Sequence, residues 1–406
     1  MQMVQPTLSL DVLHNIMLYA CRDAVAKMMQ TCHILNHEGV KYLMGRDICL
    51  CSSRDVVSFT EFLVAGLRYT NGVPEAVHRL SNLIILTLAF RERNHPAIEA
   101  STESWEDPGP PTEFFFRVLG PLAVNLTQLS IYEAEDLFAA HPPLADTIAN
   151  LTSLKILKLS FVGEQCAKML RSLRSQLIDV DLNACNADEV EIDEDDINPI
   201  GLLENSQATL KRLSITYTAS SASGPCYPNV RVLSLSYISE PITWHYVRAY
   251  PNTTSLLTSM CGDEGWNDDV EPCRERNIAL QKARGSWSSL QYFSGTVYEL
   301  YILGLTCHVT KLELDHELGE LYPDLLSAVL KDTHPVHLDL AVPKVSHLPE
   351  QALVNVMHQA EVLSLETLTL RIRYAGEDNW ADVQPFLVSH RPLLPSDVSS
   401  IPRILG

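Results

Sequence analysis

Histidines and cysteines at short spacing are the residues of this chain most able to do chemistry. They form three groups: Cys32, His33 and His37; Cys49 and Cys51; and His334 and His337. His33 and His37 share one face if a helix runs through them. A structural zinc site needs four such ligands, commonly with a C-x-x-C pair, and no C-x-x-C pair occurs in the chain. We therefore expect polar surface histidines and buried thiols, and no bound metal.

Enzyme motifs are missing as well. The chain has no G-x-S-x-G elbow, no H-E-x-x-H helix and no glycine-rich phosphate loop. The acidic run ADEVEIDEDDINP at 187–199 lacks the glycine and the final glutamate of a calcium loop, so it is expected to be a solvated loop. We expect no catalytic residue, no cofactor and no enzyme; a hydrolase whose triad is assembled only by the fold remains the alternative.

The charge balance limits the possible partners. The chain has 406 residues with 30 Lys and Arg against 50 Asp and Glu, which gives a formal net charge of −20. Such a chain is repelled by nucleic acids and by anionic membrane surfaces. The first residues contain no basic segment followed by an apolar core, and the longest apolar run, 83–90, is too short to cross a membrane. We expect a cytoplasmic or nuclear protein, in keeping with ten scattered cysteines.

A motif of the form L-x-x-L-x-L recurs from about residue 80. It occupies 80–88, 126–131, 151–159, 176–185, 209–215, 229–235, 309–315, 335–341 and 365–371. The polar residue between the last two apolar ones predicts a strand with one buried face. Helical spacing follows in between, at Cys166, Leu170, Leu173 and Leu177; at Leu318, Leu321, Leu325 and Val329; and after Pro349 at Leu353, Val356, Met357 and Ala360. The pattern predicts α/β units that are stable only when stacked.

This pattern resembles the leucine-rich repeat family. The resemblance implies an irregular solenoid over 49–379, with loop insertions at 91–114, 187–199 and 219–229, and a C-terminal cap or tail at 380–406. The interval of 79 residues between Leu235 and Leu314 is long enough to contain two degenerate units, near Leu257 and Phe293. An α/β domain with a chance spacing of leucines is the alternative.

The segment LSLDVLHNIMLYACRDAVAKMMQTCHIL, residues 8–35, fits two short helices. Ser9 can cap the first helix, and Asp11 sits favourably near its positive end. A helical unit of 1–48 is too small to bury all its apolar side chains. We expect the surplus to be covered by the repeats or by another protein.

The same segment resembles an F-box, although Ser9 replaces the usual proline and Leu35 the usual aromatic residue. Followed by leucine-rich repeats, it resembles F-box/leucine-rich-repeat proteins and the divergent F-box proteins of fungi. The resemblance implies a substrate-recognition adaptor of a Skp–cullin–F-box ubiquitin ligase, which binds a Skp-family adaptor and a protein substrate. The adaptor-binding residues would be Leu8, Leu10, Asp11, Val12, Ile16, Met17, Val25 and Met28. A helical cap on a repeat scaffold without any ligase link is the alternative.

The substrate would lie on the exposed face of the predicted sheet. By period-two alternation this face carries Lys158, Asp181, Asn183, Ser214, Thr216, Glu313, Asp315 and Asp339, together with Ser234 and Thr369. Acidic residues outnumber basic ones here, which leads to the hypothesis that the ligand has a basic segment. Ordinary solvated sheet polarity is the alternative.

Overall fold

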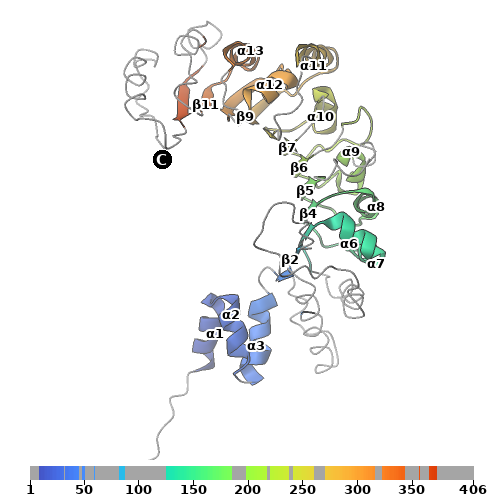
Figure 1. Cartoon of the computed structure of the whole chain (residues 1–406), viewed down its shortest axis with the longest axis vertical. Coiled ribbons are helices and arrows are strands. Elements are labelled where there is room, and N and C mark those ends of the chain that lie inside the picture. The colour runs from blue at the N-terminus through green and yellow to red at the C-terminus, as the bar shows by residue number, and fades with distance from the viewer. Residues whose placement is uncertain are drawn as a thin grey trace, which may run out of the picture. The chain divides into compact units, whose positions relative to one another are not determined.

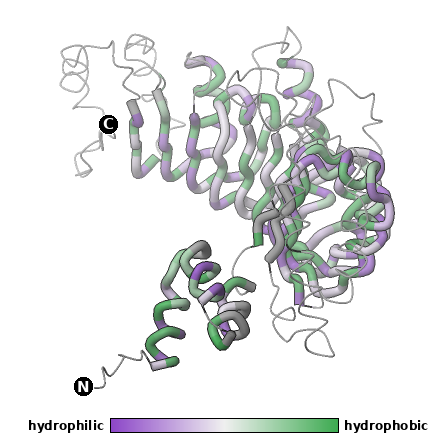
Figure 2. Tube along the Cα trace, turned by 60° about the horizontal axis from the view of Figure 1, so that its bottom comes forward, coloured by the Kyte–Doolittle hydropathy of each residue, from purple (hydrophilic) through white to green (hydrophobic). Residues whose placement is uncertain are grey.

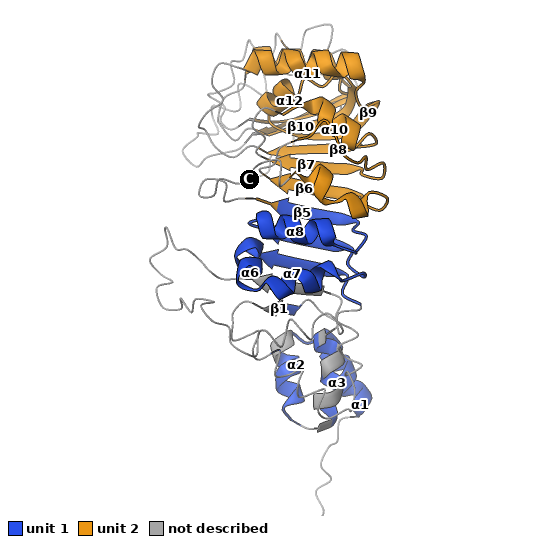
Figure 3. Cartoon of the chain, turned by 90° about the vertical axis from the view of Figure 1, so that its right-hand side faces the viewer, with its two compact units in different colours: residues 1–182 blue, residues 183–406 orange. Residues whose placement is uncertain are grey.

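The computed structural model describes somewhat more than half of the chain. The described residues are 9–31, 33–44, 48–50, 59, 82–86, 125–184, 198–216, 220–236, 241–259, 270–315, 322–342, 356 and 365–372. They fall into two compact units, Met1–Leu182 and Asn183–Gly406, which we call unit 1 and unit 2 (Figure 3).

Unit 1 begins with three helices and continues with strands and helices. The helices are α1 (Leu10–Tyr19), α2 (Arg22–Met29), α3 (His33–Met44), α6 (Ala134–Ala140), α7 (Pro142–Ala149) and α8 (Glu164–Ser172). The strands are β1 (Ile48–Leu50), β2 (Asn82–Leu86), β3 (Gln128–Tyr132), β4 (Ile156–Ser160) and β5 (Asp179–Asn183), the last of which ends one residue past the unit boundary.

Unit 2 alternates strands and helices more regularly. Its strands are β6 (Arg212–Thr216), β7 (Val232–Ser236), β8 (Ser255–Ser259), β9 (Ser289–Gly295), β10 (His308–Leu314), β11 (His337–Val342) and β12 (Thr367–Ile372). Its helices are α9 (Pro199–Leu202), the 3-10 turn η3 (Glu204–Ser206), α10 (Thr243–Ala249), α11 (Val270–Arg284), α12 (Val297–Leu303) and α13 (Pro323–Thr333). Figure 1 shows these helices along one side of the strands.

Within each unit the strands are neighbours in sequence order, and every pair whose register is defined is parallel. Buried and more exposed residues alternate along β4 to β7, as at Leu213, Ser214 and Ile215. The helices that the structure describes lie on one side of these strands; the buried aliphatic side chains face them, and the more exposed polar ones face away. Each buried leucine contributes about 1.5–3 kcal/mol relative to exposure.

The expected α/β class and the strand positions are confirmed. All nine segments carrying the motif contain a strand, and β8 and β9 lie at the two degenerate positions near Leu257 and Phe293. β1 was not anticipated. The insertion at 91–114, the tail at 380–406 and nearly all of the expected helix after Pro349 lie outside the described residues.

Two expected boundaries are wrong. The helix through Cys166 ends at Ser172, because Leu173 is extended and the Ser175 hydroxyl donates to the carbonyl of Leu151, which lies between α7 and β4, at 2.6 Å. Leu177, expected on this helix, is therefore buried in the approach to β5.

The acidic insertion also ends earlier than expected. Pro199 is the first residue of α9, since the Asn198 side chain accepts a hydrogen bond from the Ile200 amide at 3.0 Å and caps the helix. In the third expected insertion, residues 220–229 form neither helix nor strand.

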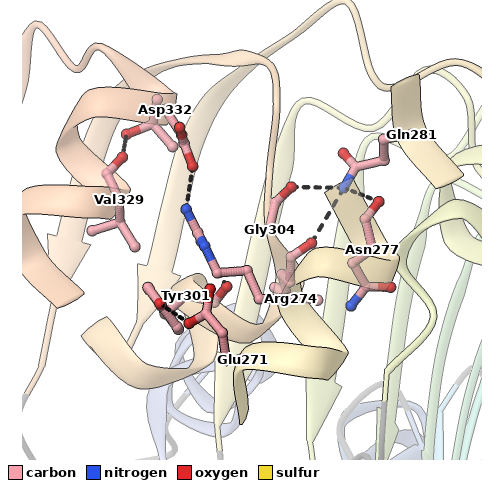
Figure 4. A network of polar contacts seen from close by, with 10 residues as sticks. Glu271, Arg274, Asn277, Gln281, Tyr301, Gly304, Val329 and Asp332 are labelled. Atoms are coloured by element: carbon pink, nitrogen blue, oxygen red, sulfur yellow. Dashed lines mark hydrogen bonds and ion pairs between the residues drawn. The ribbon is translucent and has the colours of Figure 1, made fainter. Parts of the chain in front are cut away.

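The C-terminal end of α12 is capped by side chains from α11 (Figure 4). A helix leaves its last four carbonyls without a partner inside the helix. Here the donors lie one to two turns apart on α11, and the bonds run from Arg274 to Tyr301 O (2.9 Å), from Asn277 to Ile302 O (2.9 Å) and from Gln281 to Gly304 O (2.8 Å). Three carbonyls at the end of this short helix thereby gain side-chain partners.

An ion pair, a contact between Arg274 and an aromatic ring, and a glycine at the helix end stabilise this cap. The Arg274 guanidinium is buried; it forms an ion pair with Asp332 of α13 and lies 4.1 Å from the centre of the Tyr301 ring. The Tyr301 hydroxyl donates to Glu271. Burial, and to a smaller extent the Glu271 carboxylate, raise the pKa of Tyr301 to about 12. Gly304 ends α12 with φ of +53°, in the left-handed region that glycine adopts without strain.

Replacing Asn277 by alanine should destabilise unit 2 strongly. The Asn277 amide group is fully buried; it donates to Pro241 O and Ile302 O and accepts from the Thr243 amide. Loss of these bonds should lower the free energy of unfolding by about 2–4 kcal/mol in urea denaturation. Glu275→Ala, an exposed change on the same helix, should cost no more than about 0.5 kcal/mol. Equal effects of both changes would contradict this account of the cap.

Candidate functional site

An apolar surface on α1 is the first candidate site. Large hydrophobic side chains lie exposed on α1 and at the start of α3: Leu10, Val12 and Ile16 at 43% each, Leu18 at 51%, Tyr19 at 85% and Ile34 at 59%. Figure 2 shows the hydrophobic colouring along these helices. We call the Val12, Ile16 and Tyr19 side chains the α1 stripe, because their spacing of four and three residues places them on one face.

The opposite face of α1 fills the core of the three-helix unit. Met17 is fully buried and packs with Val25, Met29 and Leu35. Gly39 allows the close approach of α2 and α3, because a Cβ at this position would lie 2.2 Å from Met29 Cγ. The unit thus has a packed core that does not include the α1 stripe.

The structure divides the eight residues expected to bind a Skp-type adaptor. Leu8 lies outside the described residues. Four side chains are exposed, namely Leu10, Asp11, Val12 and Ile16, whereas Met28 is half-buried and Met17 and Val25 are in the core. Met17 and Val25 therefore support the surface from beneath.

Sequence reasoning missed three exposed apolar residues. Tyr19 and Leu18 end α1, and Ile34 begins α3. The spacing of Val12, Ile16 and Tyr19 is a signal that could have found Tyr19, since it completes a stripe at i, i+4 and i+7. Nothing comparable marks Ile34.

The strand face opposite the described helices is the second candidate site, and it is described in each unit by itself. Of the ten residues expected there, Lys158 and Thr369 are exposed, and eight are partly exposed: Asp181, Asn183, Ser214, Thr216, Ser234, Glu313, Asp315 and Asp339. In unit 2 the register aligns Ser214 with Ser234, and Glu313 with Ser294 and Asp339. The side chains of adjacent strands thus form rows across the sheet.

Hydroxyl groups dominate the part of this face formed by β6 to β8. Ser214 and Thr216 lie on β6, Ser234 and Ser236 on β7, and Ser259 on β8. The Ser236 and Ser259 hydroxyl oxygens are 2.7 Å apart. These groups can donate and accept hydrogen bonds without bringing charge.

Charged groups dominate the part formed by β9 to β12. We call Tyr292, Lys311, Glu313, Asp339 and Arg371 the charge cluster. Arg371 Nε donates to Asp339 Oδ1 at 2.6 Å, and its Nη2 is 3.1 Å from Glu313 Oε1. The other Glu313 oxygen accepts from the Tyr292 hydroxyl at 2.8 Å and is 3.6 Å from Lys311 Nζ.

These pairings change the meaning of the acidic residues. The hypothesis of a basic ligand rests on Asp181, Glu313 and Asp339, and Arg371 and Lys311 already balance the charges of the last two. Although burial opposes it, Asp339 and Glu313 raise the pKa of Arg371, while burial and Glu313 raise the pKa of Tyr292. A ligand would meet an ordered, mixed-charge surface, with Tyr292 protonated and Arg371 held in place.

The described histidines and cysteines make no metal centre. Among the residues that the structure describes, no three His, Cys, Asp or Glu side chains are grouped to hold a metal ion. His337 Nδ1 lies 2.7 Å from Thr367 Oγ1, and His334 ends α13 with φ of +45°. Cys32 and the side chains of His33 and His37 are outside the described part.

Comparisons with known proteins leave the family open: no protein-family model matches the chain, and no curated protein is significantly similar to it. None of the helices within the described ranges is both long enough and apolar enough to traverse a bilayer. The function is therefore inferred from the α1 stripe and the sheet face.

Adjacent residues of α1 should respond oppositely to substitution. Met17→Ala should lower the melting temperature of the three-helix unit, since it opens a cavity worth about 2–5 kcal/mol. Ile16→Ser should change stability by no more than about 0.5 kcal/mol, because its side chain is exposed. Circular dichroism of both variants checks this. A large loss of stability for Ile16→Ser would show that the α1 stripe is part of the core.

The charge cluster should give a measurable coupling energy. In a double-mutant cycle of Asp339→Asn and Arg371→Gln, we expect about 0.5–1 kcal/mol, kept small by partial exposure and reduced by added salt. The exposed pair Glu164 and Lys168 on α8, 2.7 Å apart, serves as a control that should give a smaller coupling. A coupling at the cluster no larger than in the control would mean that Arg371 is not held in place.

Proposed function

We propose that the protein is a substrate-recognition adaptor of a Skp–cullin–F-box-type ubiquitin ligase. One observation carries the proposal: the α1 stripe remains exposed on a helical unit whose own core is already filled by Met17, Val25, Met29 and Leu35. An apolar helix face that its own domain does not need is suited to a partner groove. The α1–α3 unit would be the F-box-like domain, and a Skp-family protein its partner.

In this proposal the rest of the chain forms an irregular leucine-rich-repeat solenoid. Parallel strands in sequence order, buried aliphatic residues on one side and covering helices on that side are the features expected of such repeats. Irregularity is expected as well, since the strand intervals vary and the strand-ending Asn or Cys of the family occurs in the sequence only as Cys185.

The sheet face would hold the protein substrate. Its hydroxyl part and its charge cluster offer hydrogen bonds and charges of both signs at fixed positions, without any bond-breaking chemistry. The protein would act by raising the effective concentration of the substrate near a recruited enzyme, in the cytoplasm or nucleus. A repeat scaffold without ligase function would use the same face and leave the α1 stripe without a role.

Binding of a purified Skp-family adaptor to the full chain tests the proposal. Ile16→Glu places a charge in the α1 stripe and should weaken binding at least tenfold in isothermal titration calorimetry, because a buried unpaired charge is costly. Asn15→Asp is a matched control on the same helix, outside the stripe, and should change the affinity little.

Two outcomes would refute the adaptor role. The first is no binding of the unaltered chain to any Skp-family protein tested. The second is equal affinity of Ile16→Glu and the unaltered chain, with circular dichroism showing both folded. Either result would leave a repeat scaffold that binds through its sheet face.

A further inference from the structure

Three apolar side chains interrupt the polar face of β7, β8 and β9. They are Val232 on β7, Leu257 on β8 and Tyr292 on β9, and we call them the apolar patch. Each is partly exposed, and in each strand the adjacent residue that faces the helices is buried. The apolar patch therefore belongs to the sheet face of unit 2 and not to its core.

Serines alternate with the apolar patch across the three strands. The register gives two rows of three residues, all partly exposed: Val232, Ser255 and Tyr292 in one row, and Ser234, Leu257 and Ser294 in the other. Adjacent strands are about 4.8 Å apart, so Val232 and Tyr292 are about 10 Å apart with a serine between them. Because serine is smaller than leucine or tyrosine, the neighbours in each row leave the flanks of the apolar patch accessible.

Charged side chains beside the apolar patch already have partners. Lys311 follows Tyr292 in its row; its Nζ lies 3.6 Å from a Glu313 oxygen and 5.4 Å from the centre of the Tyr292 ring. Arg212 precedes Val232 in the same row and has an interaction of its own. A charged ligand group would lose its hydration here in exchange for charges that are already engaged, so an uncharged ligand fits better.

The serine hydroxyls indicate the conformation of the ligand. Within the part of the chain that the structure describes, the hydroxyls of Ser234 and Ser255 have no hydrogen-bond partner. An extended segment exposes main-chain N–H and C=O groups with which such hydroxyls can pair, whereas a helix pairs these groups internally. The alternation of serine and apolar side chains therefore suits an extended segment.

We propose that the apolar patch binds an extended protein segment that presents one large aliphatic or aromatic side chain between uncharged residues. That side chain lies over Ser255 and contacts Val232, Leu257 and Tyr292, while the serine hydroxyls bond to the main chain of the segment. This inference rests on the proposed role of the sheet face in holding the substrate, and it names the chemistry of the substrate.

Selection of short random peptides displayed on phage, with the full chain immobilised, tests the specificity. The library is counter-selected on the Leu257→Glu variant, whose fold is checked by circular dichroism. We expect the enriched peptides to share one large aliphatic or aromatic residue with uncharged neighbours. No enrichment over the variant, or enriched peptides dominated by charged residues, would overturn the proposal.

The affinity of an enriched peptide, measured by fluorescence anisotropy, tests the contacts. Leu257→Ser and Tyr292→Ser should each weaken binding about tenfold, since each removes apolar area that the ligand covers. Tyr292→Phe removes the hydroxyl that donates to Glu313 but keeps the ring, so its affinity should fall less than threefold. Equal losses for Tyr292→Phe and Tyr292→Ser would show that the charge cluster, not the ring, binds the ligand.

Leu10→Ser is the matched control, because Leu10 is an exposed leucine on α1, outside the sheet face. It should leave peptide affinity unchanged, and equal affinities of the Leu10 and Leu257 variants would contradict the site. Leu257→Ser should in turn bind a Skp-family adaptor as the unaltered chain does. Loss of peptide selection with adaptor binding retained would remove this inference alone, whereas failure of adaptor binding with peptide selection retained would remove only the ligase role.

Discussion

The structure depends on one constraint: a strand that buries only one face needs adjacent strands beside it and helices packed on that face. Leu213, Leu233 and Leu256 are each shielded by the helices on one side and by adjacent strands along the sheet. Helices are needed only where aliphatic side chains point. On the other face the described side chains are less buried than those facing the helices, so packing constrains their identity less. Ser214 and Glu313 occupy such positions.

The short helices are stabilised by hydrogen bonds that neighbouring helices make to their ends. Helices of seven to nine residues are marginal alone. α8 has glycine at its N-terminal boundary, and Glu135 of α6 accepts hydrogen bonds there from the amides of Gln165 and Cys166 at 2.8 and 3.0 Å. The same carboxylate, after burial, helps to raise the pKa of Cys166. At the C-terminal end of α12, side chains of α11 likewise supply hydrogen bonds, there to the carbonyls of Tyr301 and Ile302.

Much of this architecture could be predicted from periodicity, because alternation is a local property of the chain. Even β8 and β9, which lack the full motif, were predicted from the length of the interval between Leu235 and Leu314. Contacts between residues far apart in the sequence could not be predicted. Whether Ile16 or Met17 enters the core depends on where α2 and α3 pack, and the pairing of Arg371 with Asp339 depends on strand register across 32 residues. Asn277 lies on a helix rich in charged residues, so nothing in the sequence indicated its burial.

The cap that α11 provides for α12 restricts how this part of the chain can change over evolutionary time. A strand and helix that contact only their immediate neighbours could be duplicated or deleted by themselves. Here a duplication that inserted a unit between α11 and α12 would separate Arg274 and Asn277 from the carbonyls of Tyr301 and Ile302. The segments that contain α11 and α12 would therefore have to be duplicated or deleted together.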